Sequence, residues 1–532
     1  MSMKQAVLCA LTCAAALFWL SATSAAGSLE DAPPGLQPTT ASLSDVLSHY
    51  DSSENAQIVH TRIEQWRVSE RGLTGSYVET TSGDDYRAVL TLGPLTSMNG
   101  RWHGQSWRQD ENGLTVLRQD IHQKSAISEE ALDYALDHPR SPGRGIELVG
   151  EIDAPAHAYV VRVHPEGGRL VWLFFDAASG LIDREESVEA ERRTVTEYDD
   201  WRPIDGEMHA WHHHISDGHA NNDEDWTLLS LRNDVPVAAA DLEIPADRRM
   251  LVEFPTGETQ VRLPARVVNG RVIVRLTIAG RGLDFLLDSG AGDIAVDSGM
   301  AQALHLATFG KVTQEIAGQF DRSTAIVPEI RIGDLLMHDV IVSTIPFQSQ
   351  PTADTKIVGL LGFDFFKDAV VRIDYARGTV DAIDPSRFVA PQAAVSLPVA
   401  LDDGVPLVSA EVGDDEGDHF IIDTGSTFTI IFSGFAADHP DAVADQGGGL
   451  AERREYPTLA QGVGGQVLLV PTEIRSLRFA GAQFEYVQVY VTHAARALER
   501  EDEDGLIGAP TLSRFIVYLD YARQRVELIR NG

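Results

Sequence analysis

Cysteine is almost missing from this chain of 532 residues. The two that occur, Cys9 and Cys13, both lie in the first apolar segment. Removal of that segment would leave a chain without thiols, which excludes disulfide bonds and cysteine protease chemistry. Long apolar runs are scarce too: the run from Ala6 to Leu20 is short for a membrane span, and no later segment is long enough.

Residues 1–26 have the features of a secretory signal peptide. A single charged residue, Lys4, precedes the apolar run, and the small residues Ser24, Ala25 and Ala26 follow it. We expect cleavage after Ala26, export to a bacterial periplasm or to the cell exterior, and no membrane span in the mature chain. The alternative is a retained N-terminal anchor. Residues 27–41 are predicted to form a flexible leader.

Basic residues are also few. The chain has 43 Lys and Arg against 79 Asp and Glu, which gives a formal net charge of −36. A field of this sign repels nucleic acid and anionic lipid, so we expect neither as a partner. Acidic runs such as Glu501 to Asp504 are expected to be solvated loops.

Tryptophan is missing from the C-terminal part of the chain. All seven tryptophans beyond the leader precede residue 230, which indicates two kinds of domain. Residues 42–245 contain short alternating runs separated by Gly, Asp or Asn, which predict a β-rich N-terminal domain of unknown role. We expect an antiparallel, possibly half-barrel, sheet with a helix near Ser42 to Tyr50, followed by a linker over 246–262.

A repeat with four landmarks dominates the remainder of the chain. Its first landmark is Asp288-Ser289-Gly290-Ala291 in one copy and Asp423-Thr424-Gly425-Ser426 in the other. The remaining landmarks follow in the same order in both copies: Ser-Gly at 298 and 433, Gly-Leu-Leu-Gly or Gly-Leu-Ile-Gly at 359 and 505, and Asp-Tyr-Ala-Arg at 374 and 520. The copies are predicted to occupy 263–384 and 399–530, joined by a linker over 385–398.

Each copy of the Asp motif follows a predicted hairpin, whose second strand carries the Asp to a turn. The glycines, Gly290 and Gly425, suit a close approach that a side chain would obstruct. The hydroxyl groups of Ser289 and Thr424 can tie the two turns together across a pseudo-twofold axis.

The paired motifs, each followed by an apolar-apolar-Gly segment, resemble those of retropepsin-like and pepsin-like aspartic peptidases. The resemblance covers about half of the chain, and its segments Leu360-Leu361-Gly362 and Leu506-Ile507-Gly508 match the family pattern. It implies two fused retropepsin-like β units, with Asp288 and Asp423 as the catalytic pair and a peptide or protein as substrate. One chain would suffice to build the site.

Two neighbouring carboxylates cannot both ionise cheaply, so such a pair holds one proton, and its ionised member can activate water. The resemblance therefore implies an aspartic endopeptidase that needs no metal or other cofactor. Two alternatives stay open: an inactive peptide-binding or protein-binding module of the cell envelope, and a two-carboxylate glycosidase. A glycosidase would not explain the twofold repeat.

In this family a Gly-bearing hairpin closes over the substrate. Gly462, Gly464 and Gly465 are the candidates in the second copy, and Gly318 is the candidate in the first. Neither segment has the Tyr that pepsin-like enzymes place there.

Two other groups of residues are candidates for chemistry. His212 and His214 share a strand face and could chelate a metal, although a strand entering a turn explains the pattern better. Asp293 and Asp297 follow the first motif closely, and we expect Asp297 or Ser298 to cap a short helix.

Overall fold

The computed structural model describes residues 32–55, 59–118, 123–189, 192–315, 319–347, 356–443, 457–462, 465–492 and 503–531. The chain divides into two compact units, which we call the N-terminal and C-terminal units. The N-terminal unit comprises Met1–Asp110, Asp120–Pro245 and Gly310–Thr313; the C-terminal unit comprises Glu111–Gln119, Ala246–Phe309 and Gln314–Gly532. The proposed signal peptide lies outside the described residues.

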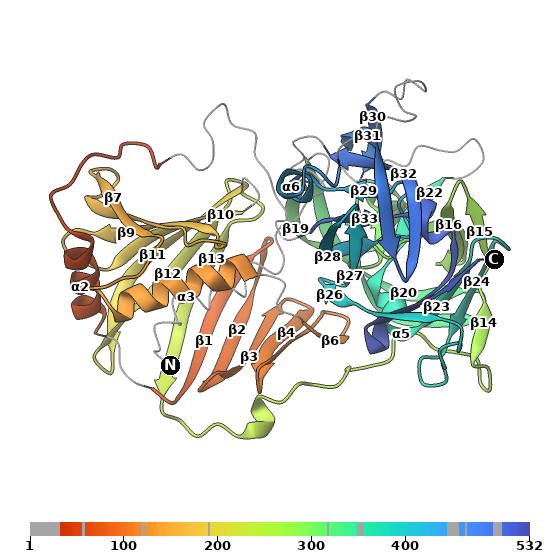
Figure 1. Ribbon diagram of the computed structural model, residues 1–532. Coiled ribbons are helices and arrows are strands. Elements are labelled where there is room, and N and C mark those ends of the chain that lie inside the picture. Colours follow the sequence, from red (N-terminus) through yellow and green to blue (C-terminus); the bar gives the residue numbers. More distant parts are fainter. Residues whose placement is uncertain are drawn as a thin grey trace. The chain divides into compact units, whose positions relative to one another are not determined.

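An antiparallel meander forms the first sheet, as predicted (Figure 1). Its thirteen strands follow the order β6-β5-β4-β3-β2-β1-β13-β12-β11-β10-β9-β8-β7. The strands are β1 (Thr61–Glu70), β2 (Leu73–Ser82), β3 (Asp85–Leu92), β4 (Leu95–Trp102), β5 (Gln105–Gln109), β6 (Thr115–Leu117), β7 (Ile146–Ile152), β8 (Ala158–Val163), β9 (Leu170–Asp176), β10 (Ile182–Glu189), β11 (Arg192–Ile204), β12 (Glu207–Ser216) and β13 (Glu224–Asn233).

Two helices, α2 (Leu43–Glu54) and α3 (Gln123–Asp137), pack on part of this sheet (Figure 1). Helix α2 begins where the sequence predicts, because the Ser42 hydroxyl accepts a hydrogen bond from the Asp45 N–H. Apolar side chains of both helices, including Leu47 and Leu136, share one buried cluster with strand residues such as Phe175. Burial of this face therefore holds the helices on the sheet.

The C-terminal unit contains two eight-stranded sheets with the same strand arrangement. We call the two repeats of the sequence that contain these sheets the first and second halves. The first runs β15-β16-β17-β22-β18-β21-β20-β19 and the second β26-β27-β28-β33-β29-β32-β31-β30. The first comprises β15 (Ala265–Val268), β16 (Arg271–Ile278), β17 (Arg281–Leu287), β18 (Ala295–Asp297), β19 (Thr308–Glu315), β20 (Gln319–Ile332), β21 (Leu335–Ile345) and β22 (Ile357–Leu361). The second comprises β26 (Ala400–Asp402), β27 (Val405–Val412), β28 (Asp415–Ile422), β29 (Ile430–Ile431), β30 (Thr458–Gly462), β31 (Gly465–Phe479), β32 (Ala482–Thr492) and β33 (Gly505–Ile507).

A third sheet takes strands from both halves. Its order is β14 (Gln260–Arg262), β24 (Thr379–Ile383), β23 (Val370–Asp374), β34 (Phe515–Asp520), β35 (Arg525–Arg530) and β25 (Val395–Pro398). The short helices in the described part of the chain are η2 (Ala239–Asp241), α4 (Ser298–Ala303), α5 (Phe363–Asp368), α6 (Ser433–Asp438), α8 (Ala509–Leu512) and η3 (Tyr521–Arg523). The antiparallel pairing of β23 with β34 joins the two halves through backbone hydrogen bonds.

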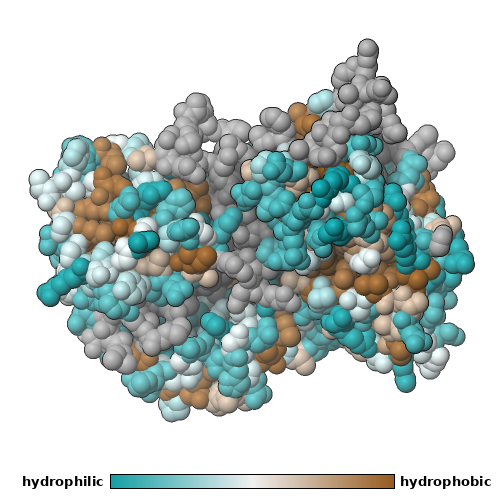
Figure 2. All heavy atoms as spheres, in the orientation of Figure 1, coloured by the Kyte–Doolittle hydropathy of each residue, from teal (hydrophilic) through white to brown (hydrophobic). Residues whose placement is uncertain are grey.

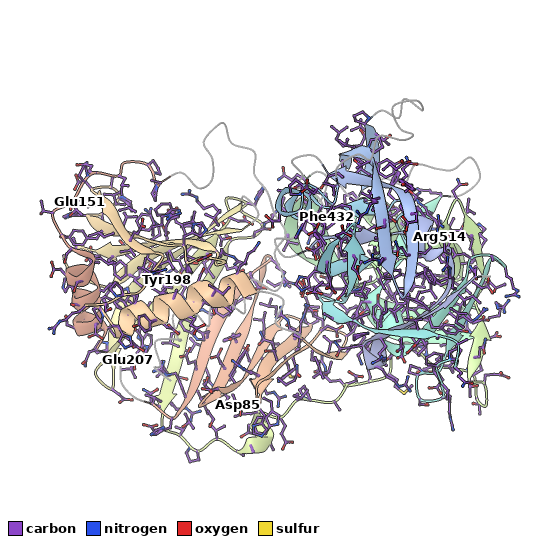
Figure 3. All side chains as sticks on the ribbon, in the orientation of Figure 1. Asp85, Glu151, Tyr198, Glu207, Phe432 and Arg514 are labelled. Carbon is purple, nitrogen blue, oxygen red and sulfur yellow. The ribbon has the colours of Figure 1, made fainter. Side chains whose placement is uncertain are left out.

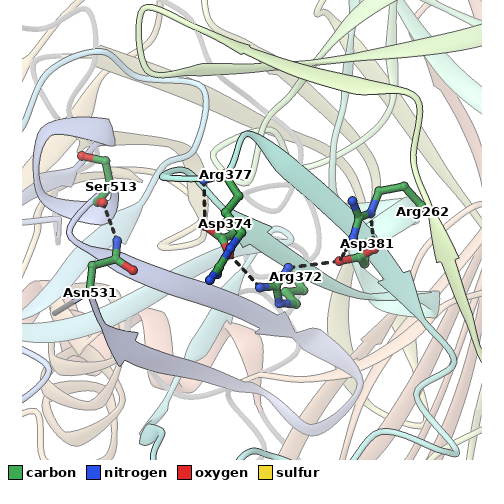
Figure 4. A network of polar contacts seen from close by, with 7 residues as sticks. All are labelled: Arg262, Arg372, Asp374, Arg377, Asp381, Ser513 and Asn531. Carbon is green, nitrogen blue, oxygen red and sulfur yellow. Dashed lines mark hydrogen bonds and ion pairs between the residues drawn. The ribbon is translucent and has the colours of Figure 1, made fainter.

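Ion pairs reinforce the third sheet (Figure 4). Asp374 Oδ2 accepts hydrogen bonds from Arg377 Nη1 at 2.8 Å and Arg372 Nη2 at 2.9 Å. Arg372 also donates to Asp381 at 3.1 Å, and Arg262 donates to the same carboxylate at 2.5 Å. Asp374 is fully buried, so its guanidinium partners are needed to offset the loss of its hydration.

Asn112 anchors the segment Glu111–Gln119 within the C-terminal unit. Its amide donates to the Ile341 carbonyl and to Asp364 Oδ1, both at 2.8 Å, and accepts from the Ile341 N–H at 2.9 Å. Arg249 Nη2 donates to Asn112 Oδ1 at 3.2 Å. Asp364 itself accepts from the Ile294 N–H at 2.7 Å. The first half therefore depends on a residue that precedes it by more than a hundred positions.

Hydrophilic and hydrophobic residues are interspersed on the face of each unit drawn in Figure 2. No helix in the described ranges is long and apolar enough to cross a membrane.

Candidate active site

The two Asp turns occupy equivalent places in the two halves. Strand β17 pairs with β22 in parallel, and strand β28 pairs in the same way with β33. The Asp288 N–H donates to the Leu361 carbonyl and the Asp423 N–H to the Ile507 carbonyl, both at 3.1 Å. The apolar-apolar-Gly segments therefore hold the start of each turn, in agreement with the predicted hairpin and landmark order.

Ser289 and Thr424 tie the turns together in a reciprocal pattern. The Ser289 N–H donates to Thr424 Oγ1 at 3.1 Å, and the Thr424 N–H donates to Ser289 Oγ at 2.9 Å. Each hydroxyl then donates to the opposite strand: Ser289 Oγ to the Ile422 carbonyl at 2.6 Å, and Thr424 Oγ1 to the Leu287 carbonyl at 2.8 Å. Both side chains are fully buried, so these four bonds are shielded from water.

The two motif glycines allow the carboxyl groups to approach each other. A Cβ on Gly425 would lie 2.5 Å from Asp288 Cγ, and a Cβ on Gly290 would lie 2.9 Å from Asp423 Cγ. Both distances are shorter than any normal carbon contact, so each glycine makes room for the carboxyl group of the other half.

The downstream glycines are equally constrained. A Cβ on Gly362 would lie 2.2 Å from the Asp293 carbonyl oxygen, and one on Gly508 would lie 1.8 Å from the Phe428 carbonyl oxygen. In both halves, therefore, the last residue of the apolar-apolar-Gly segment packs directly on the loop that follows the Asp turn.

Asp288 and Asp423 are half-buried, and their carboxyl groups are hydrogen-bonded to each other. Burial raises the pKa of Asp288 well above its ordinary value, and the charge of Asp423 and a hydrogen bond between the two carboxyls raise it further. Burial also raises the pKa of Asp423, against backbone N–H donors from Gly425 at 2.7 Å and Ser426 at 3.1 Å. Asp288 accepts one such bond, from Gly290 at 3.0 Å.

The unequal hydrogen bonding distinguishes the two carboxyls. Backbone N–H donors stabilise an ionised carboxylate, and Asp423 accepts two of them where Asp288 accepts one. The negative charge of the pair is therefore better accommodated on Asp423 and the shared proton on Asp288. The titration still belongs to the pair as a whole.

Arg271, which the sequence did not single out, is a cation whose field acts on both carboxyls. Its charge lowers the pKa of Asp288 and of Asp423, against the larger effect of burial. Arg271 directly follows the turn of the β15–β16 hairpin, and the corresponding position after the β26–β27 turn is the buried apolar Val405. The electrostatic environment of the pair is thus not symmetric.

Tyr521 supports the Asp288 turn through a hydrogen bond to its backbone. Its hydroxyl donates to the Ser289 carbonyl at 3.2 Å. Burial raises its pKa well above the ordinary value, and the charges of Asp288 and Asp423 add to this, so it remains a neutral donor. The equivalent Tyr375 is also buried, but its hydroxyl has no hydrogen-bond partner among the described residues. The repeated Asp-Tyr-Ala-Arg motif was the sequence signal for this pair.

Only part of the predicted flap is described. Gly462 and Gly465 face each other at the ends of β30 and β31, which form an antiparallel hairpin. Gly318 and Gly464 lie outside the described residues. A role for this hairpin in closing over a substrate stays a prediction.

The acids near the first turn have structural partners. Asp293 accepts hydrogen bonds from Arg322, at 2.5 Å, and from Ser343. Asp297 caps helix α4 by accepting from the Met300 N–H at 2.9 Å, as predicted.

In the N-terminal unit, His212 and His214 both contact Asp225, at 3.5 and 3.1 Å. The described ranges contain no group of three or more His, Cys, Asp or Glu residues that could hold a metal ion.

Comparison with known protein families identifies the class of protein to which this site belongs. The turns, the reciprocal hydroxyl bonds and the adjacent carboxyls define an aspartic protease fold. The sequence matches the aspartyl protease family over residues 274–365 and 408–511. The C-terminal unit therefore contains a retropepsin-like aspartyl protease domain in two segments.

Several solved structures are similar to parts of this chain. An aspartic proteinase from Irpex lacteus is 14% identical, with a TM-score of 0.33, over 51% of this chain and 98% of its own. Soybean basic 7S globulin is 13% identical, with a TM-score of 0.33, over 52% and 95%. A DUF1329 family protein from Desulfovibrio piger is 12% identical, with a TM-score of 0.29, over 38% and 98%. No curated protein matches the sequence.

Proposed function

We propose that this chain is an aspartic endopeptidase that acts on a peptide or protein in the cell envelope or outside the cell. The observation that carries the proposal is the coupled pair of Asp288 and Asp423, delivered by equivalent turns and raised in pKa by burial and by each other. The family match supports a peptide as substrate. Export is proposed from the features of the leader alone.

The pair can divide the work of peptide hydrolysis between its members. Asp423, the better stabilised anion, accepts a proton from a water molecule as its oxygen attacks the scissile carbonyl carbon. Asp288 donates its proton to the carbonyl oxygen, which gives a neutral tetrahedral diol. When the C–N bond breaks, Asp423 donates its proton to the nitrogen and Asp288 takes back a proton from one diol hydroxyl. An amine and a carboxylic acid are released, and the pair again holds one proton. The protein forms no covalent bond to the substrate.

The geometry keeps this pair in one protonation state over a range of pH. Loss of the shared proton would place two negative charges side by side, which the half-buried site disfavours. Addition of a second proton removes the base. We therefore expect a bell-shaped pH profile whose two limbs belong to the pair. The field of Arg271 lowers both pKa values and so shifts this profile toward acid.

One chain supplies the whole site, because Asp288 and Asp423 lie in the two halves of the same polypeptide. Dimerisation is therefore not needed to assemble it.

The test is digestion of an unbiased peptide mixture by the chain across a wide pH range, with the products read by mass spectrometry. Asp423→Asn is the test variant, and Asp334→Asn is the matched control, because Asp334 lies exposed in the turn between β20 and β21. We expect cleavage by wild type and control, and none by Asp423→Asn. Folded wild-type protein that is silent at every pH would contradict the proposal and favour the binding-module alternative.

A further inference from the structure

A second candidate site lies in the C-terminal unit and does not include the carboxyl pair. It is a pocket of about 490 Å³ lined by strand β32, by the loop that follows the Asp423 turn and by residues of the chain's C-terminal segment. This volume is within the range of about 300–1,000 Å³ that is usual for ligand sites. Figure 3 labels one of its lining residues, Arg514, beside the strands of the second half.

Two arginines converge in this pocket on one aromatic ring. The guanidinium carbon of Arg514 lies 4.8 Å from the centre of the Phe484 ring, and that of Arg530 lies 5.7 Å from the same centre. Phe484 is itself buried and contacts Phe515, so the ring is fixed. Stacking on a fixed ring orients both guanidinium groups and reduces the entropy lost when they bind a ligand.

The two positive charges are not neutralised within the described part of the chain. Neither arginine forms an ion pair with a carboxylate of the described residues, although acids outnumber bases almost two to one in the sequence. Arg514 Nε donates to the Pro510 carbonyl at 3.4 Å. Glu485 is the one acid among the described lining residues, and its carboxylate accepts from the Gln483 amide. Two cations that line one pocket and have no ion-pair partner among the described residues favour the binding of an anion.

Three further aromatic residues, Phe428, Tyr486 and Tyr490, line the pocket among Thr, Gln, Val and Pro residues, and one of the three is conformationally strained. Phe428 and Tyr490 contact each other edge to face, with ring centres 4.7 Å apart. Tyr486 is exposed and has a φ of 49°, a left-handed conformation that is costly for a bulky side chain. The equivalent position of the first half is Asp339, with a φ of 47°, a residue type that tolerates this conformation well. Strain of this kind in a pocket wall is typical of binding sites.

We propose that this pocket binds an acidic segment of a polypeptide, with Arg514 and Arg530 as the carboxylate-binding residues. Planar guanidinium groups match the two oxygens of a carboxylate, and the aromatic walls can pack on the aliphatic part of Glu side chains. The net charge of −36 does not prevent this, because charges farther away than about 8 Å are largely screened at physiological ionic strength.

The position of the pocket gives it a use in proteolysis, and this part of the inference rests on the proposed function. Phe428 lies five residues after Asp423 in the sequence and lines the pocket. A substrate whose cleaved bond lies at the carboxyl pair could place an acidic stretch farther along its chain in this pocket. The site would then select substrates by a feature outside the cleaved sequence.

Binding is tested without catalysis, in full-length Asp423→Asn protein. The probe is a fluorescein-labelled peptide of five glutamates, capped at both ends, and the matched probe has five glutamines. We expect the glutamate peptide to bind at least about tenfold more tightly than the glutamine peptide, and its affinity to fall as salt is added. The double change Arg514→Gln and Arg530→Gln should reduce the affinity for the glutamate peptide by about tenfold or more.

Arg331→Gln is the control variant, because Arg331 is exposed, as Arg514 and Arg530 are, but pairs with Glu329 and does not line the pocket. It should leave the affinity unchanged. Equal affinity for the two peptides, or an unchanged affinity after the double substitution in folded protein, would overturn the inference. The binding assay does not depend on cleavage, so it can succeed even if the chain proves inactive. In an active chain, the double substitution should raise KM for substrates with an acidic stretch and leave kcat unchanged.

Discussion

Removal of one hydroxyl group between the two Asp turns should lower the free energy of unfolding of the whole C-terminal unit. The change is Thr424→Val, which keeps the shape of the side chain and deletes Oγ1. That atom accepts from the Ser289 N–H at 3.1 Å and donates to the Leu287 carbonyl at 2.8 Å, in a fully buried position. Two buried backbone groups would lose these partners, at about 1–3 kcal/mol each, so we expect the free energy of unfolding to fall by about 2–6 kcal/mol.

The absence of tryptophan after Trp226 makes this loss measurable. In a urea titration, tryptophan fluorescence reports only on the N-terminal unit, whereas circular dichroism reports on both. With an m-value of about 2–3 kcal/mol/M, the loss moves the midpoint of the C-terminal unit by about 0.7–3 M. The fluorescence midpoint should not move. Thr424→Ser retains the hydroxyl group and serves as the control.

The same variant should lose peptidase activity even at urea concentrations at which it is still folded. The turns that hold Asp288 and Asp423 would lack the two hydrogen bonds of Thr424 Oγ1. A circular dichroism midpoint equal to that of wild type would refute the reasoning, since it would mean that these buried hydroxyl bonds contribute nothing to the fold.

Three further predictions concern other residues. Gly425→Ala should abolish peptide cleavage, because the new Cβ would lie 2.5 Å from Asp288 Cγ, whereas Gly434→Ala, with open space around its Cβ, should be active; an active Gly425→Ala enzyme would contradict the close approach. Burial and the charge of Glu129 raise the pKa of Glu185 to about 8, so the contribution of Glu185 to the stability of the N-terminal unit should be fully present below about pH 4.5 and be lost as the pH rises to about 8, because the unfolded chain releases this proton first. Glu185→Gln should remove this part of the pH dependence of thermal unfolding, and an unchanged slope between about pH 4.5 and 8 would count against it. Asn112→Ala should destabilise the first half by about 3 kcal/mol, since it removes the bonds to Ile341 and Asp364; unchanged hydrogen exchange in β21 would argue against that anchor.

The features that could be predicted from the sequence are those encoded over short distances. The turn at Asp288 and its copy at Asp423 each follow a hairpin whose strands are adjacent in sequence, so alternation and turn residues were sufficient. The repeat then supplied the long-range information, because two equivalent segments with matched landmarks imply equivalent positions in space.

Residues that act across long sequence separations could not be found in this way. Asn112 is an ordinary polar residue in a turn, and its partner Asp364 is 252 positions later. Nothing in a single sequence signals such a contact. Arg271 likewise looks like one of many exposed strand residues, and its effect on the carboxyl pair follows from the hairpin turn that carries it. The Asp-Tyr-Ala-Arg repeat was visible, but the support that Tyr521 gives to Ser289 was not.

The domain boundaries at 245 and 262, the signal peptide and the flap stay predictions. The compact units exchange short segments, Glu111–Gln119 and Gly310–Thr313, which a linear division of the sequence does not represent. A shortened chain that begins after residue 245 would lack Asn112, so activity tests belong on the full chain.

The central claim is that Asp288 and Asp423 act as one catalytic unit. It is tested most directly by kcat/KM for a single cleavable peptide, measured for wild type, Asp288→Asn, Asp423→Asn and the double variant. If the pair shares one proton and one water, either single change should reduce kcat/KM as far as the double change does, because half of the pair has no function alone. A single variant that retains activity, or losses that add up in the double variant, would contradict the account.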